Sequence, residues 1–264
     1  MGVLNVTPDS FYDGGKFMED EKVLKQTKRM LDEGASFIDI GGASSRPGSN
    51  PVSPKEEIKR VIPAITTILK NFPKAVISID TTSSEVAEKA VESGAAIVND
   101  ISAGTVDKRM LEAVASLCVP YIAMHMQGTP KKMQNNPSYQ NVVSDVFAAL
   151  EGFCNRATQL GIKQLILDPG FGFGKTLSHN YQLLNQLERF HSLGCPLLVG
   201  VSRKSMIQKI VNVDAENALN GTTAIHTIAA QKGASILRVH DVKEAVQVFQ
   251  LVNYLNQQQS TPTT

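Results

Sequence analysis

Polar residues that could recognise a flat ligand follow three short apolar runs of this sequence. Asp80 and Asp168 each follow such a run, and Asn99 ends another. Carboxylates accept hydrogen bonds from amide and amino N–H groups, and a carboxamide both donates and accepts. We therefore interpret these three residues as groups that bind the amide and amino edge of a nitrogen heterocycle.

A second set of residues has the chemistry of a phosphate site. Arg238 and His240 lie at the end of the last apolar run, and Asn5 lies in the first one. Arginine binds phosphate through paired N–H donors. We predict an anionic group at these residues. Asn5 could also hold Mg²⁺, an ion that prefers few protein oxygens together with substrate phosphates.

The stretch 165–176 is glycine-rich but matches neither common nucleotide motif. It ends like a Walker A loop, yet Pro169 stands where that motif needs its first glycine, and Lys175 stands where the dinucleotide fingerprint needs its third. We interpret the stretch as one wall of a pocket in which Phe171 and Phe173 cover a flat ligand. Lys175 is then expected to be a bystander.

The sequence has no arrangement typical of covalent or zinc-dependent catalysis. It contains no H-E-x-x-H motif and no serine in a nucleophile elbow, and its five histidines are scattered. A mechanism of binding and positioning is therefore favoured over one built on a nucleophile.

Composition excludes several classes of partner. The 26 lysines and arginines nearly balance the 25 aspartates and glutamates, so no overall basic field exists to attract nucleic acid or anionic lipid. No apolar run is long enough to span a membrane, and no signal peptide is recognisable. The cysteines, Cys118, Cys154 and Cys195, are far apart in sequence and favour a reducing, cytoplasmic location.

The elements that position these residues can be predicted from a repeating pattern in the sequence. Short apolar runs alternate with longer amphipathic segments, and this pattern predicts β-α units. The expected strands are 3–6, 37–40, 76–79, 97–99, 121–124, 165–167, 197–199 and 236–239. The expected helices are 20–33, 54–70, 84–93, 108–117, 138–160, 179–191, 215–232 and 242–257.

Eight such units in about 250 residues predict an α/β fold, a single-domain (β/α)8 TIM barrel over residues 1–257. The polar residues 258–264 are expected to form a disordered tail. In such a barrel the carboxyl ends of all strands meet at one mouth. The heterocycle-binding and phosphate-binding residues are therefore expected to converge.

Several motifs give the chain a resemblance to the dihydropteroate synthase family. They are Gly2-Val-Leu-Asn-Val-Thr-Pro-Asp-Ser-Phe-Tyr-Asp-Gly-Gly15, Ser45-Arg-Pro-Gly48, Ile79-Asp-Thr81, Val98-Asn-Asp-Ile-Ser102, Asp168-Pro-Gly-Phe-Gly-Phe-Gly-Lys175, Gly200-Val-Ser-Arg-Lys-Ser205, Gly221-Thr222 and Arg238-Val-His-Asp241. The resemblance implies an enzyme of folate synthesis. It would join p-aminobenzoate to 6-hydroxymethyl-7,8-dihydropterin diphosphate, giving 7,8-dihydropteroate and pyrophosphate.

The resemblance also implies roles for individual residues. The implied pterin-binding residues are Asp80, Asn99, Ile101, Met124, Asp168 and Lys204. Those on the p-aminobenzoate side are Phe11, Ser45, Arg46, Pro47, Phe173 and Ser202. Those at the diphosphate are Asn5, Arg46, Arg238 and His240, with Mg²⁺ on Asn5. The implied catalytic residues are Lys204, Arg238, His240 and Asp13, the last facing the developing cation or the attacking amine.

The loop after the second predicted strand departs from the family pattern at two positions. Ala43 stands where the family usually has glutamate, and Ser45 stands where it usually has threonine.

Family members are often dimers through helices late in the barrel, and the apolar segment 218–230 leads us to expect a homodimer.

Three other functions agree with part of the pattern. Arg238 and His240 alone would suit an isomerase or aldolase acting on a sugar phosphate, with Lys204 as its catalytic lysine. A methyltetrahydrofolate-binding domain of a corrinoid methyltransferase would share the pterin slot. A catalytically silent pterin binder is the third alternative.

Overall fold

The computed structural model describes residues 1–6, 16–43, 52–128, 133 and 136–259. Its strands are β1 (Gly2–Asn5), β2 (Ile38–Gly41), β3 (Ile77–Asp80), β4 (Ile97–Asp100), β5 (Tyr121–Met124), β6 (Leu165–Asp168), β7 (Leu198–Val199) and β8 (Ile236–Leu237). All neighbouring pairs are parallel.

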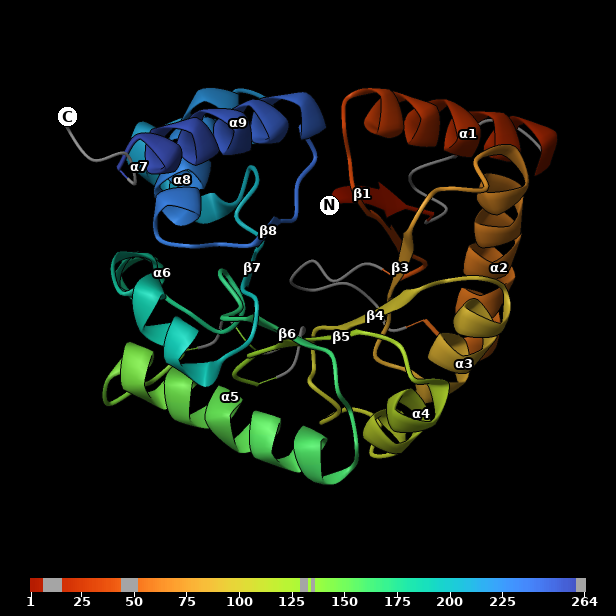
Figure 1. Ribbon diagram of the computed structural model, residues 1–264, viewed down its shortest axis with the longest axis horizontal. Coiled ribbons are helices and arrows are strands. Elements are labelled where there is room, and N and C mark those ends of the chain that lie inside the picture. The colour runs from red at the N-terminus through yellow and green to blue at the C-terminus, as the bar shows by residue number, and fades with distance from the viewer. Residues whose placement is uncertain (7–15, 44–51, 129–132, 134–135, 260–264) are drawn as a thin grey trace.

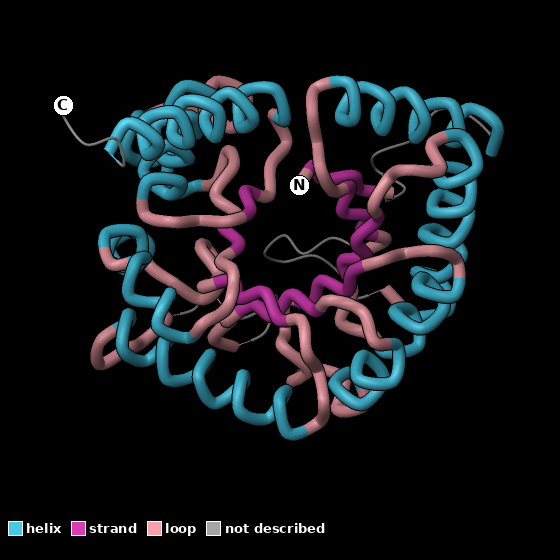
Figure 2. The backbone as a smooth tube through the Cα atoms, in the orientation of Figure 1, coloured by secondary structure: helices cyan, strands magenta, loops and turns pink. Residues whose placement is uncertain are grey.

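The eight strands form a closed ring. Strands β1 to β6 are hydrogen-bonded in sequence order, and β7 pairs with β8. A parallel bridge between Leu167 and Leu197 joins β6 to the start of β7, and one between Gly2 and Val239 joins the end of β8 to β1. Figure 2 shows this ring of strands inside a ring of helices. The predicted TIM barrel is confirmed.

The helices lie outside the ring (Figure 1). They are α1 (Lys16–Asp32), α2 (Pro54–Asn71), α3 (Ser84–Glu92), α4 (Met110–Leu117), α5 (Val142–Gln159), α6 (Leu177–Asn185), α7 (Ser205–Val211), α8 (Leu219–Gln231) and α9 (Val242–Gln259), with a 3-10 helix η2 (Leu187–Leu193). In the described part of the chain, no helix combines the length and apolarity that crossing a membrane requires.

Several helices differ from the sequence prediction. The expected helix 179–191 is divided into α6 and η2 at Gln186, the residue that ends the one and precedes the other. The expected helix 138–160 starts later because the side chain of Asn141 accepts from Ser144 N and caps it. Helix α7 was not predicted, and α9 continues two residues into the expected tail, the rest of which lies outside the described residues.

Alternation along the strands separates two hydrophobic clusters. Successive side chains of a strand point to opposite faces, so Ile38 and Ile40 pack outward on the helices while Asp39 between them points into the barrel. Ile97, Ile122 and Leu198 form a separate buried cluster. Ile97 lies two residues before Asn99 on the same face of β4, so this cluster fills the barrel beneath the polar residues.

Candidate active site

The centre of the barrel mouth is a network around one guanidinium group. Arg238 donates through Nε to Asp39 Oδ2 and through Nη2 to Asp80 Oδ2, both at 2.6 Å. Asn99 Nδ2 donates to the same oxygen of Asp39 at 3.1 Å. Residues from β2, β3, β4 and the end of β8 are thus joined through a single cation.

Burial makes these charges interdependent. Burial raises the pKa of Asp80, while the neighbouring Arg238 lowers it and Asp39 raises it further. Burial also opposes the charge on Arg238, but Asp39 and Asp80 together hold its pKa above the ordinary arginine value. Arg238 therefore stays positively charged at the mouth.

Two features of this network differ from the sequence interpretation. That interpretation set Arg238 in a phosphate corner away from the heterocycle-binding residues, whereas the structure bonds it directly to Asp80. It also assigned no role to Asp39, which is fully buried. The Ile-Asp-Ile alternation of β2 was the available signal, because it places a carboxylate on the interior face.

The turn between β6 and α6 contacts both Asp168, at the end of β6, and Lys204, which precedes α7. Asp168 Oδ1 accepts from Gly170 N at 2.7 Å, and Lys204 Nζ donates to Phe171 O at 2.6 Å. Lys204 Nζ also lies 4.7 Å from the centre of the Phe173 ring, a cation–π contact. Burial lowers the pKa of Lys204 to about 8, although Asp168 raises it.

The two phenylalanines of this turn have different surroundings. Phe173 is half-buried beneath Lys204, where it can contact a ligand. Phe171 is fully buried in the hydrophobic core. The expectation that both rings cover a ligand is therefore wrong for Phe171, whose contribution to the site is its backbone carbonyl.

The structure also corrects the interpretation of Lys175 as a bystander. Its side chain is buried, and Nζ donates to the carbonyl oxygens of Gly170, Phe173 and His125 at 2.9, 3.0 and 3.2 Å. It lies 3.0 Å from His125 Nδ1. Sequence reasoning judged Lys175 against phosphate motifs only, and its contacts arise from the folding of two separate turns.

The turn after β4 is held by a buried carboxylate. Asp100 Oδ1 accepts from the backbone N and the hydroxyl of Ser102, both at 2.7 Å. Asp100 Oδ2 accepts from Gly104 N at 2.8 Å and from the Tyr121 hydroxyl at 2.6 Å. These bonds fix the backbone on either side of Ile101, which is half-buried next to this network.

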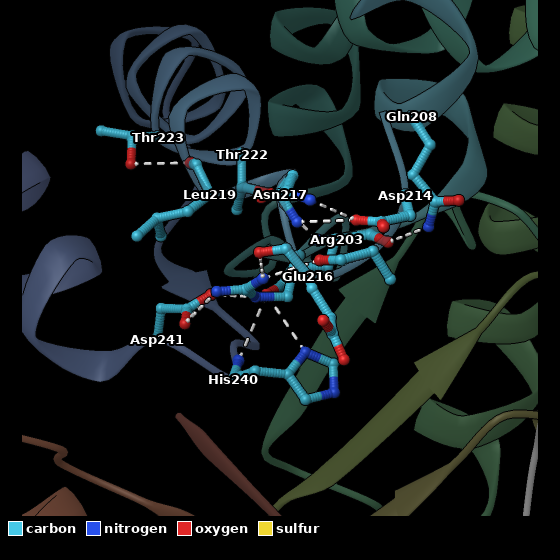
Figure 3. Close-up of polar contacts among 12 residues, drawn as sticks. Arg203, Gln208, Asp214, Glu216, Asn217, Leu219, Thr222, Thr223, His240 and Asp241 are labelled. Atoms are coloured by element: carbon cyan, nitrogen blue, oxygen red, sulfur yellow. Dashed lines mark hydrogen bonds and ion pairs between the residues drawn. The ribbon is translucent and has the colours of Figure 1, made fainter. Parts of the chain in front are cut away.

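The turns after β7 and β8 are tied together by a salt bridge. Arg203 donates to both carboxylate oxygens of Asp241, at 2.8 and 2.9 Å, and to the carbonyl oxygens of Ala215 and Glu216, both at 2.6 Å (Figure 3). Its neighbour Ser202 lies 3.2 Å from both the backbone N and Nδ1 of His240. The predicted residues Ser202 and His240 are thus adjacent, held by a pair to which sequence reasoning gave no role.

Asn5 provides an oxygen suited to a hard metal ion. Its Oδ1 and Oδ2 of Asp80 lie 3.6 and 3.7 Å from the position that a Cβ on Gly41 would occupy, so the two oxygens share one region. No cluster of three or more His, Cys, Asp or Glu side chains suited to a metal occurs among the described residues. Since Asp80 Oδ2 already accepts from Arg238, Asn5 Oδ1 is the oxygen of this pair left for an ion, which fits Mg²⁺ held mainly by phosphate and water.

The remaining predicted residues are placed as follows. Met124 is buried at the end of β5. Phe11, Asp13, Ser45, Arg46 and Pro47 lie outside the described residues.

Comparisons with known proteins agree with this geometry. Residues 1–240 match the model of a family described as pterin binding enzyme. Dihydropteroate synthase of Escherichia coli strain K12 is 47% identical over 254 residues, which cover 96% of this chain and 89% of that protein. The chain belongs to the dihydropteroate synthase family.

Solved structures of dihydropteroate synthases share the fold closely. The Yersinia pestis enzyme with a sulfonamide drug aligns at a TM-score of 0.91 and 44% identity, covering 97% of this chain and 94% of that one. The Xanthomonas albilineans enzyme with 4-aminobenzoic acid aligns at 0.89 and 40%, covering 99% and 93%. Membership of this family argues against the alternative function as a sugar-phosphate isomerase or aldolase.

Substituting Tyr121→Phe tests whether the Asp100 network supports the barrel mouth. The hydroxyl is a buried donor to Asp100, so its removal should lower the free energy of unfolding by about 1–3 kcal/mol. Urea denaturation measures the loss. Tyr254→Phe, at an exposed position, is the control and should leave stability unchanged. Equal stability of the two variants would show that this hydrogen bond contributes nothing.

Proposed function

We propose that this chain is a dihydropteroate synthase that condenses 6-hydroxymethyl-7,8-dihydropterin diphosphate with p-aminobenzoate, giving 7,8-dihydropteroate and pyrophosphate. The observation that carries the proposal is the Arg238 network, which joins hydrogen-bond acceptors for a heterocycle to a fixed cation. The match of residues 1–240 to the pterin binding enzyme family supports this interpretation. The relatives bound to a sulfonamide drug and to 4-aminobenzoic acid support the choice of second substrate.

The pterin would bind between the β3, β4 and β6 ends of the barrel. Asp80, Asn99 and Asp168 would form hydrogen bonds with its amino and amide edge. Ile101 and Met124 would contact its apolar faces, and Lys204 would donate to a ring acceptor. Because these groups are held by neighbouring backbone and side chains, little reorganisation is needed when the ligand binds.

Catalysis would depend mainly on positioning and on stabilising the leaving group. As the diphosphate leaves, negative charge grows on its oxygens, and the permanently charged Arg238 with His240 would stabilise that charge. The electron-rich pterin spreads the positive charge on the methylene carbon. The aniline nitrogen then attacks, so the protein needs to align two substrates rather than to supply a nucleophile.

The p-aminobenzoate would lie on the Phe173 side of the pterin, next to Ser202. Phe11, Ser45, Arg46 and Pro47 complete this side in our proposal, with Arg46 also reaching the diphosphate. Asp13 would stabilise the cation or the attacking amine. These five residues belong to two loops whose sequences match the family, with Ala43 and Ser45 as the departures.

Mg²⁺ is the proposed cofactor, with Asn5 as the residue that would hold it. When bound, the ion would neutralise part of the diphosphate charge. Asn5 Oδ1 would supply the protein oxygen, since the nearby Asp80 Oδ2 is bonded to Arg238.

The decisive test of the activity follows pyrophosphate release. The protein is mixed with Mg²⁺, the pterin diphosphate and p-aminobenzoate, and release is compared with and without the aminobenzoate. We expect release that depends on all three additions. Release that is independent of p-aminobenzoate, or its complete absence, would refute the proposal.

Asp168→Ala should lose pterin affinity. The ring's amide edge would lose a charged acceptor in a buried site, a penalty of roughly 1.5–3 kcal/mol, which calorimetry with a pterin ligand would detect. Asp32→Ala removes an exposed carboxylate from α1 and serves as the matched control. Unchanged affinity in a folded Asp168→Ala protein would contradict the role of this residue.

Pterin affinity should also depend on pH through Lys204. Since burial lowers the pKa of Lys204 to about 8, its ammonium group loses a proton, and with it a strong donor, as pH rises through that value. We expect affinity to weaken above about pH 8. In Lys204→Met, affinity should be weak at every pH and should lose the step near pH 8, while a step near pH 7 would belong to Lys175, whose pKa burial lowers to about 7. If the variant kept the loss of affinity near pH 8, that loss would belong to a group other than Lys204.

We propose that the protein forms a homodimer through its late helices. Exposed apolar side chains gather on α7, α8 and α9, at Ile210, Val211, Ile228, Leu251, Tyr254 and Leu255. Exposed apolar side chains on three late helices favour self-association. We expect light scattering to give twice the chain mass of 28.6 kDa. The variant Ile210→Glu should then be monomeric, and a monomeric wild-type protein would overturn the proposal.

A cytoplasmic location completes the proposal. All three cysteines are free thiols, which supports a reducing compartment. Cell fractionation followed by immunodetection tests it, and recovery outside the cytoplasmic fraction would refute it.

A further inference from the structure

Lys175 places a buried ammonium group inside a cage of backbone oxygens. Nζ donates to three carbonyls, those of His125, Gly170 and Phe173, at distances between 2.9 and 3.2 Å. The residue is 3% exposed. Since taking an ammonium group out of water is costly, its burial requires that these bonds replace the lost hydration.

The carbonyls of the cage belong to two turns that both end at the barrel mouth. His125 directly follows β5, while Gly170 and Phe173 are the two ends of the tight turn after β6. The turns approach closely, since a Cβ on Gly170 would collide with His125 O. Among the described residues, the bond from His125 N to Asp168 O is the last backbone hydrogen bond between the two chain segments. The ammonium group joins the two turns beyond that point.

The clamped turn carries the groups to which we assign the substrates. Gly170 N donates to Asp168, Phe171 O accepts from Lys204 Nζ, and the Phe173 ring lies beneath the same Nζ. A change in this turn would thus move Lys204 and the Phe173 ring, although β6 would still hold Asp168.

The neighbouring imidazole adds no second positive charge to the cage. His125 Nδ1 lies 3.0 Å from Nζ. Burial, with the nearby Lys175, lowers the pKa of His125 to about 3, so its ring is neutral at physiological pH. Burial lowers the pKa of Lys175 to about 7, although Asp168 raises it.

We propose that Lys175 is a positioning residue for pterin binding, whose ammonium group fixes the turn after β6 against the end of β5 so that Lys204 and Phe173 are held in register with Asp168. The role rests on the proposed function, because it is defined by pterin affinity. In this role Lys175 acts through the three carbonyls that its Nζ bonds and not by contact with the pterin.

Chemical rescue tests the proposal. Lys175→Ala removes the side chain beyond Cβ, and n-propylammonium chloride supplies the same missing atoms. We expect pterin affinity, measured by calorimetry, to fall about tenfold or more in the variant, because three carbonyls lose a common donor. Millimolar n-propylammonium should restore most of it. Tetramethylammonium, which has the charge but no N–H donor, should not.

Two further variants separate positioning from folding. Lys175→Met keeps a long stem in the cage but no donor, so it should fold and bind pterin as weakly as Lys175→Ala without the amine. Lys163→Ala, which removes an exposed lysine just before β6, should bind like the wild type.

The outcomes are distinct. Wild-type affinity in a folded Lys175→Ala or Lys175→Met protein would overturn the positioning role and leave the proposed function intact. Failure of both variants to fold, or equal rescue by the two ammonium ions, would also overturn it, because the lysine would then serve stability or bulk charge alone. A wild-type protein that binds no pterin would instead refute the proposed function.

Discussion

The guanidinium group of Arg238 is the interaction on which the barrel mouth depends. It bonds Asp39 on β2 and Asp80 on β3, and Asn99 on β4 joins through the shared oxygen of Asp39. Breaking such a buried pair costs about 3–5 kcal/mol, yet apolar residues of similar volume are often as stable in its place. Stability alone therefore does not account for the network. Its value lies in holding a permanent cation beside hydrogen-bond acceptors at fixed positions.

Charged side chains also fix the turns around the mouth. Asp100 binds the turn after β4, Lys175 the turn after β6, and Arg203 with Asp241 the turns after β7 and β8. In each case a charged side chain satisfies backbone groups that lie outside the sheet. Turns that bind ligands need polar backbone near the surface, and a charged partner fixes them without adding strands.

Rigid turns suit the chemistry proposed for this family member. A reaction in which diphosphate leaves and an amine attacks depends on alignment and on a field prepared before the substrate arrives. Asp39, Asp100 and Asp168 are buried in this region, and burial lowers the pKa of the neighbouring Lys204 to about 8. Hydrogen bonds in such a site are stronger than in water, so displacing one turn would have a large effect on binding.

The sequence by itself determined the barrel, the family and most of the polar residues at the strand ends, because short apolar runs, amphipathic segments and motif residues are local properties. It could not show that Arg238 bonds Asp80, since residues 158 positions apart meet only when the ring closes. It also could not show the surroundings of Lys175 and Phe171. Their surroundings come from the end of β5 and from the helices packed outside the barrel, and only the tertiary structure decided which atoms of these residues face the mouth.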